Sequence, residues 1–241
     1  MTISETSLQA GPIPEQTRIR PPPGKVAVLY TKPESIVEDY GRLMRLAGLE
    51  GALPKSASTL LKVNISWQHY YPACSTSPWQ LDAVIKYLKT AGYRDVIAAH
   101  NGTVVVDPVQ GRVNNKHKEV EEASNIPHVT LDQPPVKWVR YQPASKMLVL
   151  DKIYEDGIYI PEMLLGRNVL HLPTVKTHVF TTMTGAMKNA FGGLLHRHRH
   201  WTHSLIHETL VDLLQIQHEL FNLGTMFATL DKEMLKNLPI I

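Results

Sequence analysis

The stretch that decides the fold is residues 59–102, TLLKVNISWQHYYPACSTSPWQLDAVIKYLKTAGYRDVIAAHNG. Ser77 is a good helix cap, Pro78 suits the first helical position, and Gln80 suits the third. Gly92 is a typical residue just beyond a helix C-terminus. Between them, apolar side chains recur at helical spacing, at Leu81, Val84, Ile85 and Leu88. The stretch therefore predicts one amphipathic helix after Ser77.

Two apolar runs flank this helix and predict buried strands, at 59–65 and 95–99. A strand, a helix and a second strand at this spacing form a βαβ unit, so the strands should be parallel with a right-handed crossover. We therefore expect an α/β protein with an open, mostly parallel sheet and helices on both faces. It would be Rossmann-like but not of the dinucleotide-binding type, because neither a GxGxxG motif nor a Walker loop is present.

The same reasoning outlines the rest of the chain. Residues 1–24 are polar and rich in proline, which predicts a disordered or extended arm before a single α/β domain at 25–241. A loop with one short helix is expected at 107–125. Further strands are predicted at 26–29, 128–131, 147–150, 158–160, 168–172 and 225–230, and further helices at about 33–47, 184–191 and 204–221.

Composition narrows the class of protein. The chain has 241 residues, a formal net charge of +3 and one cysteine, Cys74. One cysteine cannot form an intramolecular disulfide or hold an iron–sulfur cluster, so we expect no such cluster and a reducing, cytoplasmic location. The mild basic excess does not indicate nucleic-acid binding, and no segment has the apolar length of a membrane span.

Polar residues follow three of the predicted strands, at 62–64, 100–102 and 173–178, and the last group continues at 184–189. In open α/β sheets, ligands bind at the carboxyl ends of the strands. We therefore expect these groups to meet in one crevice and to bind a small anionic, phosphorylated or carboxylated molecule.

Each side chain of this site has an expected role. Lysines and helix N-terminal amides are natural anion donors, which assigns Lys62, Lys176, Lys188 and the Thr184-Gly185 pair to the anionic group. His178 is the candidate general acid or base, with Lys176 beside it, because an imidazole titrates near neutral pH. The ligand would be oriented by Asn64, Asn101 and Asn189. Taken singly, each lysine is better explained as a solvated surface residue.

A second cluster, HRHRHWTH at 196–203 followed by His207, is rich in histidine. On a helix, His203 and His207 would be four residues apart, a spacing that can place two imidazoles on one metal ion. The simpler interpretation is a flexible basic loop that faces solvent or an anionic ligand.

A series of short motifs resembles the patterns of the family called domain of unknown function 362: KVN at 62–64, STSP at 75–78, KTAG at 89–92, LPTVKTH at 172–178, TGAMKN at 184–189 and FG at 191–192. The family's own patterns read roughly KPN, THPE, LPKLKTH and TGALKN with FG, and the similarity runs from about Val26 to Asp212. The resemblance implies an α/β fold without an assigned reaction, and some members carry ferredoxin-type modules.

The chain departs from these patterns at Val63, Ser77 and His100, where the family has proline, histidine and often an acidic residue. Family members usually continue well past the strand that ends in Asp-Gly, whereas Asp231 here is followed by only ten residues. A C-terminal segment could therefore be missing. Three functions stay open: an enzyme acting on a small anionic metabolite, a binding or accessory protein without turnover, and a metal-dependent protein that uses the histidines at 196–207.

Overall fold

The computed structural model describes residues 2–9, 26–195, 197–220, 222–223 and 229–230. Its central sheet is entirely parallel, with the strand order β10-β7-β2-β3-β4. The bounds are β2 Thr59–Val63, β3 Val96–His100, β4 His128–Thr130, β7 Asn168–Leu172 and β10 Asn222–Leu223. The predicted open, parallel α/β fold is confirmed.

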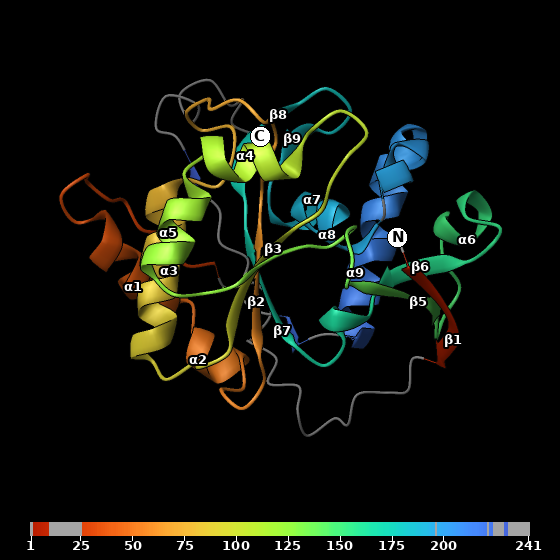
Figure 1. Cartoon of the computed structure of the whole chain (residues 1–241), viewed down its shortest axis with the longest axis horizontal. Coiled ribbons are helices and arrows are strands. Elements are labelled where there is room, and N and C mark those ends of the chain that lie inside the picture. Colours follow the sequence, from red (N-terminus) through yellow and green to blue (C-terminus); the bar gives the residue numbers. More distant parts are fainter. Residues whose placement is uncertain (1, 10–25, 196, 221, 224–228, 231–241) are drawn as a thin grey trace.

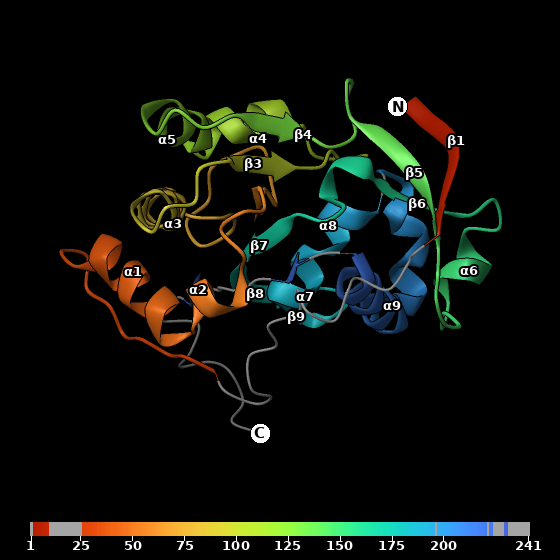
Figure 2. The same ribbon diagram turned by 90° about the horizontal axis from the view of Figure 1, so that it is seen from below.

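Helices cover both faces of this sheet, as Figures 1 and 2 show. On one side lie α1 (Ile36–Leu46), α3 (Pro78–Thr90) and α5 (His117–Ala123), with the short α2 (Leu49–Ala52) below them and α4 (Pro108–Asn114) above. On the other side lie α7 (Ala186–Asn189), α8 (Phe191–Leu194), the 3-10 helix η3 (Arg197–Leu205) and α9 (Ile206–Leu220). No helix among these residues is long and apolar enough to cross a membrane.

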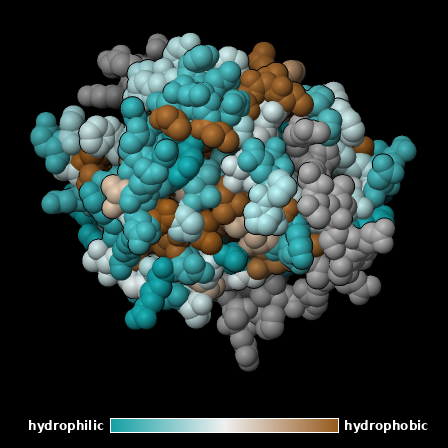
Figure 3. Space-filling view, viewed as in Figure 1, coloured by the Kyte–Doolittle hydropathy of each residue, from teal (hydrophilic) through white to brown (hydrophobic). Residues whose placement is uncertain are grey.

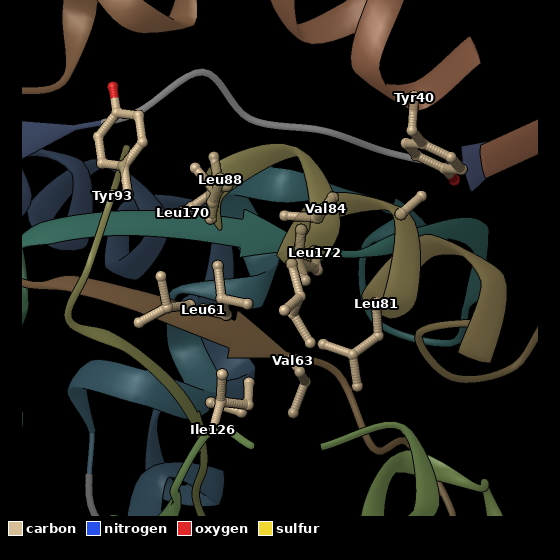
Figure 4. Packing of buried hydrophobic residues seen from close by; sticks show 14 of the residues in the cluster. Tyr40, Leu61, Val63, Leu81, Val84, Leu88, Tyr93, Ile126, Leu170 and Leu172 are labelled. Atoms are coloured by element: carbon tan, nitrogen blue, oxygen red, sulfur yellow. The ribbon is translucent and has the colours of Figure 1, made fainter. Parts of the chain in front are cut away.

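The βαβ unit forms as its sequence predicts. The Ser77 hydroxyl accepts a hydrogen bond from the backbone N–H of Gln80 (3.2 Å), and Pro78 is the first residue of α3. Strands β2 and β3 pair in parallel from Thr59 opposite Val96. Alternate residues of each strand face opposite sides, so Leu61 and Val63 pack under α1 and α3 (Figure 4), whereas Leu60 packs toward α8 and α9.

Two smaller sheets flank the central one. The first has the order β1-β5-β6 (Thr2–Gln9, Lys137–Gln142 and Ile158–Pro161) and lies beyond α9 (Figure 2). Residues 2–9 of the predicted arm are therefore an extended strand, parallel to β5. The second has the order β11-β8-β9 (Thr229–Leu230, Thr174–His178 and Thr182–Thr184) and lies beyond the carboxyl end of β7.

Two strand predictions are wrong. Residues 26–29 form no strand, and the side chains of Val26 and Val28 are 85% and 68% exposed. Residues 147–150 lead into the helix α6 (Leu150–Ile153), because the carboxylate of Asp212 accepts the backbone N–H groups of 148, 149 and 150 at 2.8–3.0 Å. These N–H groups therefore have no need of a strand partner.

Other segments differ in detail. Residues 107–125 contain two helices, α4 and α5, instead of one. The predicted helix at 184–191 is two single-turn helices, and Gly192 and Gly193 belong to the second of them instead of ending the first. A short 3-10 helix, η2 (Glu162–Leu164), precedes β7. The segment after Asp231, on which the expectation of a missing C-terminal part depends, lies outside the described residues.

Candidate anion-binding site

Lys62 lies at the carboxyl end of β2 and is completely buried on the face that α8 covers. Its ammonium donates to the carbonyl of Val63 and lies 3.3 Å from Nδ1 of His100, at the end of β3. Asn189 donates to the Lys62 carbonyl (2.8 Å) and so joins α7 to the strand. The chain passes this close only because residue 193 is glycine: an added Cβ would lie 3.1 Å from Cε of Lys62.

Burial gives these groups unusual proton affinities. Loss of hydration, followed by the positive charges of Arg199 and Lys176, holds the pKa of Lys62 well below its ordinary value. Burial and the Lys62 charge do the same to the pKa of His100. The carboxyl ends of β2 and β3 therefore bring together basic groups whose protonated forms disfavour one another.

Arg199 completes this group, and sequence reasoning missed it. Residues 197–205 form η3 instead of a flexible loop, and the Arg199 side chain is buried while it donates to the carbonyl of Gly102 (2.7 Å). Burial lowers its pKa to about 10 against the opposing effect of Asp132. The sequence signal that could have found it is its position in a basic run just after α8.

Three buried polar atoms near this group have no hydrogen-bond partner among the described residues: Nε2 of His100, Oδ1 of Asn101 and Oδ1 of Asn189. The amide nitrogen of Asn101 donates to the carbonyl of Leu195 (2.7 Å), so Asn101 ties β3 to the end of α8. In Asn101 and Asn189, the side-chain amide nitrogen thus binds a backbone carbonyl, and the side-chain oxygen has no donor among the described residues.

Lys176 lies on β8, and its ammonium connects three segments. It donates to Oδ1 of Asn64 (2.6 Å), to Oγ of Ser66 (2.6 Å) and to the carbonyl of Cys74. An ammonium has three donors, so all of them are used. Burial lowers the pKa of Lys176 to about 8. Lys176 and Asn64 therefore brace the connection after β2, and Lys176 contributes charge to the site.

His178 follows two residues later on the same face of the β8–β9 hairpin. Its Nδ1 atom accepts the backbone N–H of Phe180 (3.2 Å). The neutral imidazole therefore carries its proton on Nε2 and presents a donor at that atom. Burial, followed by the charges of Lys188, His203 and Lys176, lowers the pKa of His178 to about 4, so the ring is neutral at pH 7.

Lys188 differs from the other two lysines. Within the described ranges its ammonium makes no hydrogen bond or ion pair, and it lies 5.4 Å from the centre of the Phe191 ring. Burial and the charges of Lys176 and Arg199 lower its pKa to about 8. Among the three lysines of the site, Lys188 is therefore the one that uses none of its donors on the described residues.

The remaining predicted residues occupy less favourable places. Thr184 is buried on β9 and Gly185 precedes α7, which is a single turn, so the expected helix N-terminus has little dipole to offer. His203 belongs to η3 and the exposed His207 to α9, so the two do not share one α-helix. In the described part of the chain, no group of three or more potential ligands could hold a metal ion.

The structure brings Lys62 and Lys176 to the same rim of the sheet. The charge of Lys176 lowers the pKa of Lys62, and the Lys176 ammonium donates to Asn64, two residues after Lys62. They do not share the cavity that borders Lys62. That cavity has a volume of about 10 Å³, room for about one water molecule, and its other walls include Leu60, Leu131 and His171. A ligand would therefore meet the outer groups, Lys188 and His178, and not the buried Lys62.

Comparison with known proteins gives one match. The family model described as "Domain of unknown function (DUF362)" matches residues 59–234, most of the chain. The match begins later and extends further than the motif similarity suggested. No curated protein and no solved structure matches the chain.

Proposed function

This chain belongs to the DUF362 family, and from the geometry of its site we propose that it binds a small anionic molecule at the carboxyl rim of its sheet. The ligand class is a phosphorylated or carboxylated metabolite. Lys188 would contact the anionic group through its ammonium, and His178 would contact it through Nε2–H.

One observation carries the proposal: the positive charges at this rim lack negative partners. Lys176, Lys188 and Arg199 come from β8, α7 and η3, and no carboxylate in the described ranges forms an ion pair with any of them. In this group the negative charge of Asp132 acts on Arg199, whose pKa it raises. Uncompensated buried charge is costly, and a bound anion would relieve that cost.

The inner residues serve this site indirectly. Asn189 bonds the end of β2 to α7, Asn101 bonds the residue after β3 to the end of α8, and Lys62 contacts His100 of β3. Asn64 and Lys176 fix the connection that follows β2. Thr184 pairs with Lys176 across the β8–β9 hairpin, and Gly185 leads from the hairpin into α7. These residues would set the position of the outer donors without touching the ligand.

Turnover of the bound anion is the second candidate function. An anion beside Lys188 would offset the charges that, after burial, lower the pKa of His178, and a second proton would bind at Nδ1 once the bond from Phe180 opens. A protonated His178 could act as a general acid, and Lys176, whose donors are all used, would act only through its charge. In the free protein, however, Nδ1 is engaged by Phe180 and Nε2 carries the proton, which favours binding over base catalysis.

The test is thermal stabilisation of the full chain by phosphate, phosphorylated sugars and carboxylic acids. A ligand that binds the native state raises the melting temperature in a concentration-dependent way. Lys188→Met should abolish the shift. Lys146→Met, which removes the same charge from an exposed position, should retain it.

Equal shifts in both variants would contradict the proposed site. Turnover is tested separately, by following any stabilising ligand by NMR over hours with wild type and His178→Gln. Conversion by wild type that is lost in His178→Gln would establish the enzymatic function, and an unchanged ligand in both samples would support the binding function.

A further inference from the structure

We propose that the ligand carries a flat, apolar ring next to its anionic group, and that this ring stacks on Phe180. The inference rests on the proposed anion site and specifies the class of its ligand: an aryl phosphate or aryl carboxylate. It follows from the way in which aromatic rings are layered beside Lys188.

Phe180 ends a stack of rings. Its ring lies parallel to that of His203, with centroids 4.6 Å apart and planes inclined by 17°. Phe191 also contacts His203, with centroids 5.7 Å apart and planes inclined by 30°. Phe191 is buried, whereas Phe180 is 51% exposed and is the outermost of these rings. Because His203 covers one face of Phe180, this exposure leaves ring surface available to a ligand.

The anion donors surround the same stack. The Lys188 ammonium lies over Phe191, and its charge lowers the pKa of both His178 and His203. The His178 ring is 6.0 Å from that of Phe180, measured between centroids. Donors for an anionic group and an exposed aromatic side chain therefore lie in the same part of the surface.

Exposed apolar side chains lie near Phe180, beside the exposed Thr177 and Thr182 of the hairpin. Val179 and Met183 of the hairpin are 87% and 53% exposed, and Met187 of α7 is 39% exposed. Hydrophobic residues also gather at the upper edge of the face shown in Figure 3, where the β3–α4 connection and the hairpin lie. A purely ionic ligand, such as inorganic phosphate, would leave this apolar surface in water, whereas an aryl group would cover part of it.

The experiment compares phenyl phosphate with methyl phosphate by isothermal titration calorimetry at one pH and salt concentration. Both carry the same phosphate monoester, so they differ in the ring alone. Stacking together with burial of the ring should make phenyl phosphate bind about 10-fold more tightly or better. Phe180→Leu, which keeps the backbone N–H bonded to His178, should bring phenyl phosphate down to the affinity of methyl phosphate. Trp79→Leu removes a different exposed aromatic residue and should change neither affinity.

The outcomes separate the two proposals. Equal affinity of wild type for both esters, with both lost in Lys188→Met, would overturn the stacking inference and leave the anion site intact. A phenyl preference that survives Phe180→Leu would also overturn it, because the ring would then bind elsewhere. Failure of both esters to bind at millimolar concentration would overturn the anion site and the inference together.

Discussion

The two faces of the central sheet are formed by the same strands, yet they differ sharply at the carboxyl ends of β2 and β7. Toward α1 and α3, strands β2 and β7 present Thr59 and Asn168, which hydrogen-bond to each other, and then only apolar side chains, among them Leu61 and Leu172. Toward α8 and α9, the same strands present Leu60 and Val169 and then Lys62 and His171, which are direct neighbours in the register. Ionisable side chains of these two strands thus lie on one face only, and only near its carboxyl end.

This difference suggests that the face toward α1 and α3 serves stability and that the polar end of the other face serves function. Burial of apolar surface stabilises the fold, whereas burial of Lys62 and His171 opposes it, since the pKa of each is lowered by burial first. Natural sequences keep such local conflicts mainly at functional sites. The polar end of the second face is therefore the part of the core whose residues need a reason other than folding.

The largest expected effect concerns the apolar face. Leu61→Ala removes a side chain with no exposed surface from the cluster under α1 and α3, shown in Figure 4, and should lower the free energy of unfolding by about 2–5 kcal/mol. Urea denaturation measures the change. Leu46→Ala, at an exposed position of α1, should stay within about 0.5 kcal/mol of wild type. A small loss at Leu61 would mean that this face is not the stabilising one.

The sequence predicted the parts of the fold whose signals are local. The cap at Ser77, the helix that follows it and the strands beside it depend on neighbours within a few residues, and all of them are present. Residues 147–150 were misjudged because their conformation depends on Asp212, more than sixty positions away. Strand β5 was missed although its partner β6 was predicted at 158–160, because its other partner, β1, lies more than 120 residues earlier in the chain.

The site shows the same limit. The position of polar residues after β2, β3 and β7 could be predicted, because parallel strands deliver their ends to one edge. Which lysines would spend their donors on other residues of the protein, and which would not, could not be predicted. Lys176 and Lys188 look alike in sequence, yet one uses all its donors on Asn64, Ser66 and Cys74, and the other uses none on the described residues. That distinction depends on how the β8–β9 hairpin packs against the connection after β2, and the spacing of residues in the sequence does not reveal this packing.

The second prediction concerns the close contact between α8 and Lys62. Gly193→Ala would place a Cβ 3.1 Å from Cε and 3.2 Å from Cδ of Lys62, so it should lower the free energy of unfolding by about 1–3 kcal/mol through overpacking. Gly51→Ala, where an added Cβ meets nothing within 4 Å, is the matched control and should not destabilise.

A double-mutant cycle makes this test specific. Lys62→Ala removes the atoms that the new Cβ would meet, so Gly193→Ala should cost little in that background. An equal loss in both backgrounds would show that Gly193 is required for a reason other than its contact with Lys62.

The smallest effect is a dependence of stability on pH. The pKa values of Lys176 and Lys188 are lowered to about 8, and that of Lys62 is held well below its ordinary value by burial and by Arg199. Between about pH 8 and the ordinary lysine pKa near 10.4, the unfolded chain therefore binds more protons than the native protein, and stability should rise with pH. Lys62→Met removes one of these groups, so its stability should rise less steeply, by at most about 1.4 kcal/mol per pH unit.

Urea denaturation at several values between about pH 8 and 9.5 measures this slope, below the range in which unfolded tyrosines lose their protons. Exposed Lys146 is the control, and Lys146→Met should keep the wild-type slope. A Lys62→Met protein with an unchanged slope would mean that Lys62 keeps its proton in the native state. The polar end of the sheet would then hold a permanent buried charge, and its need for an anionic partner would be greater, not smaller.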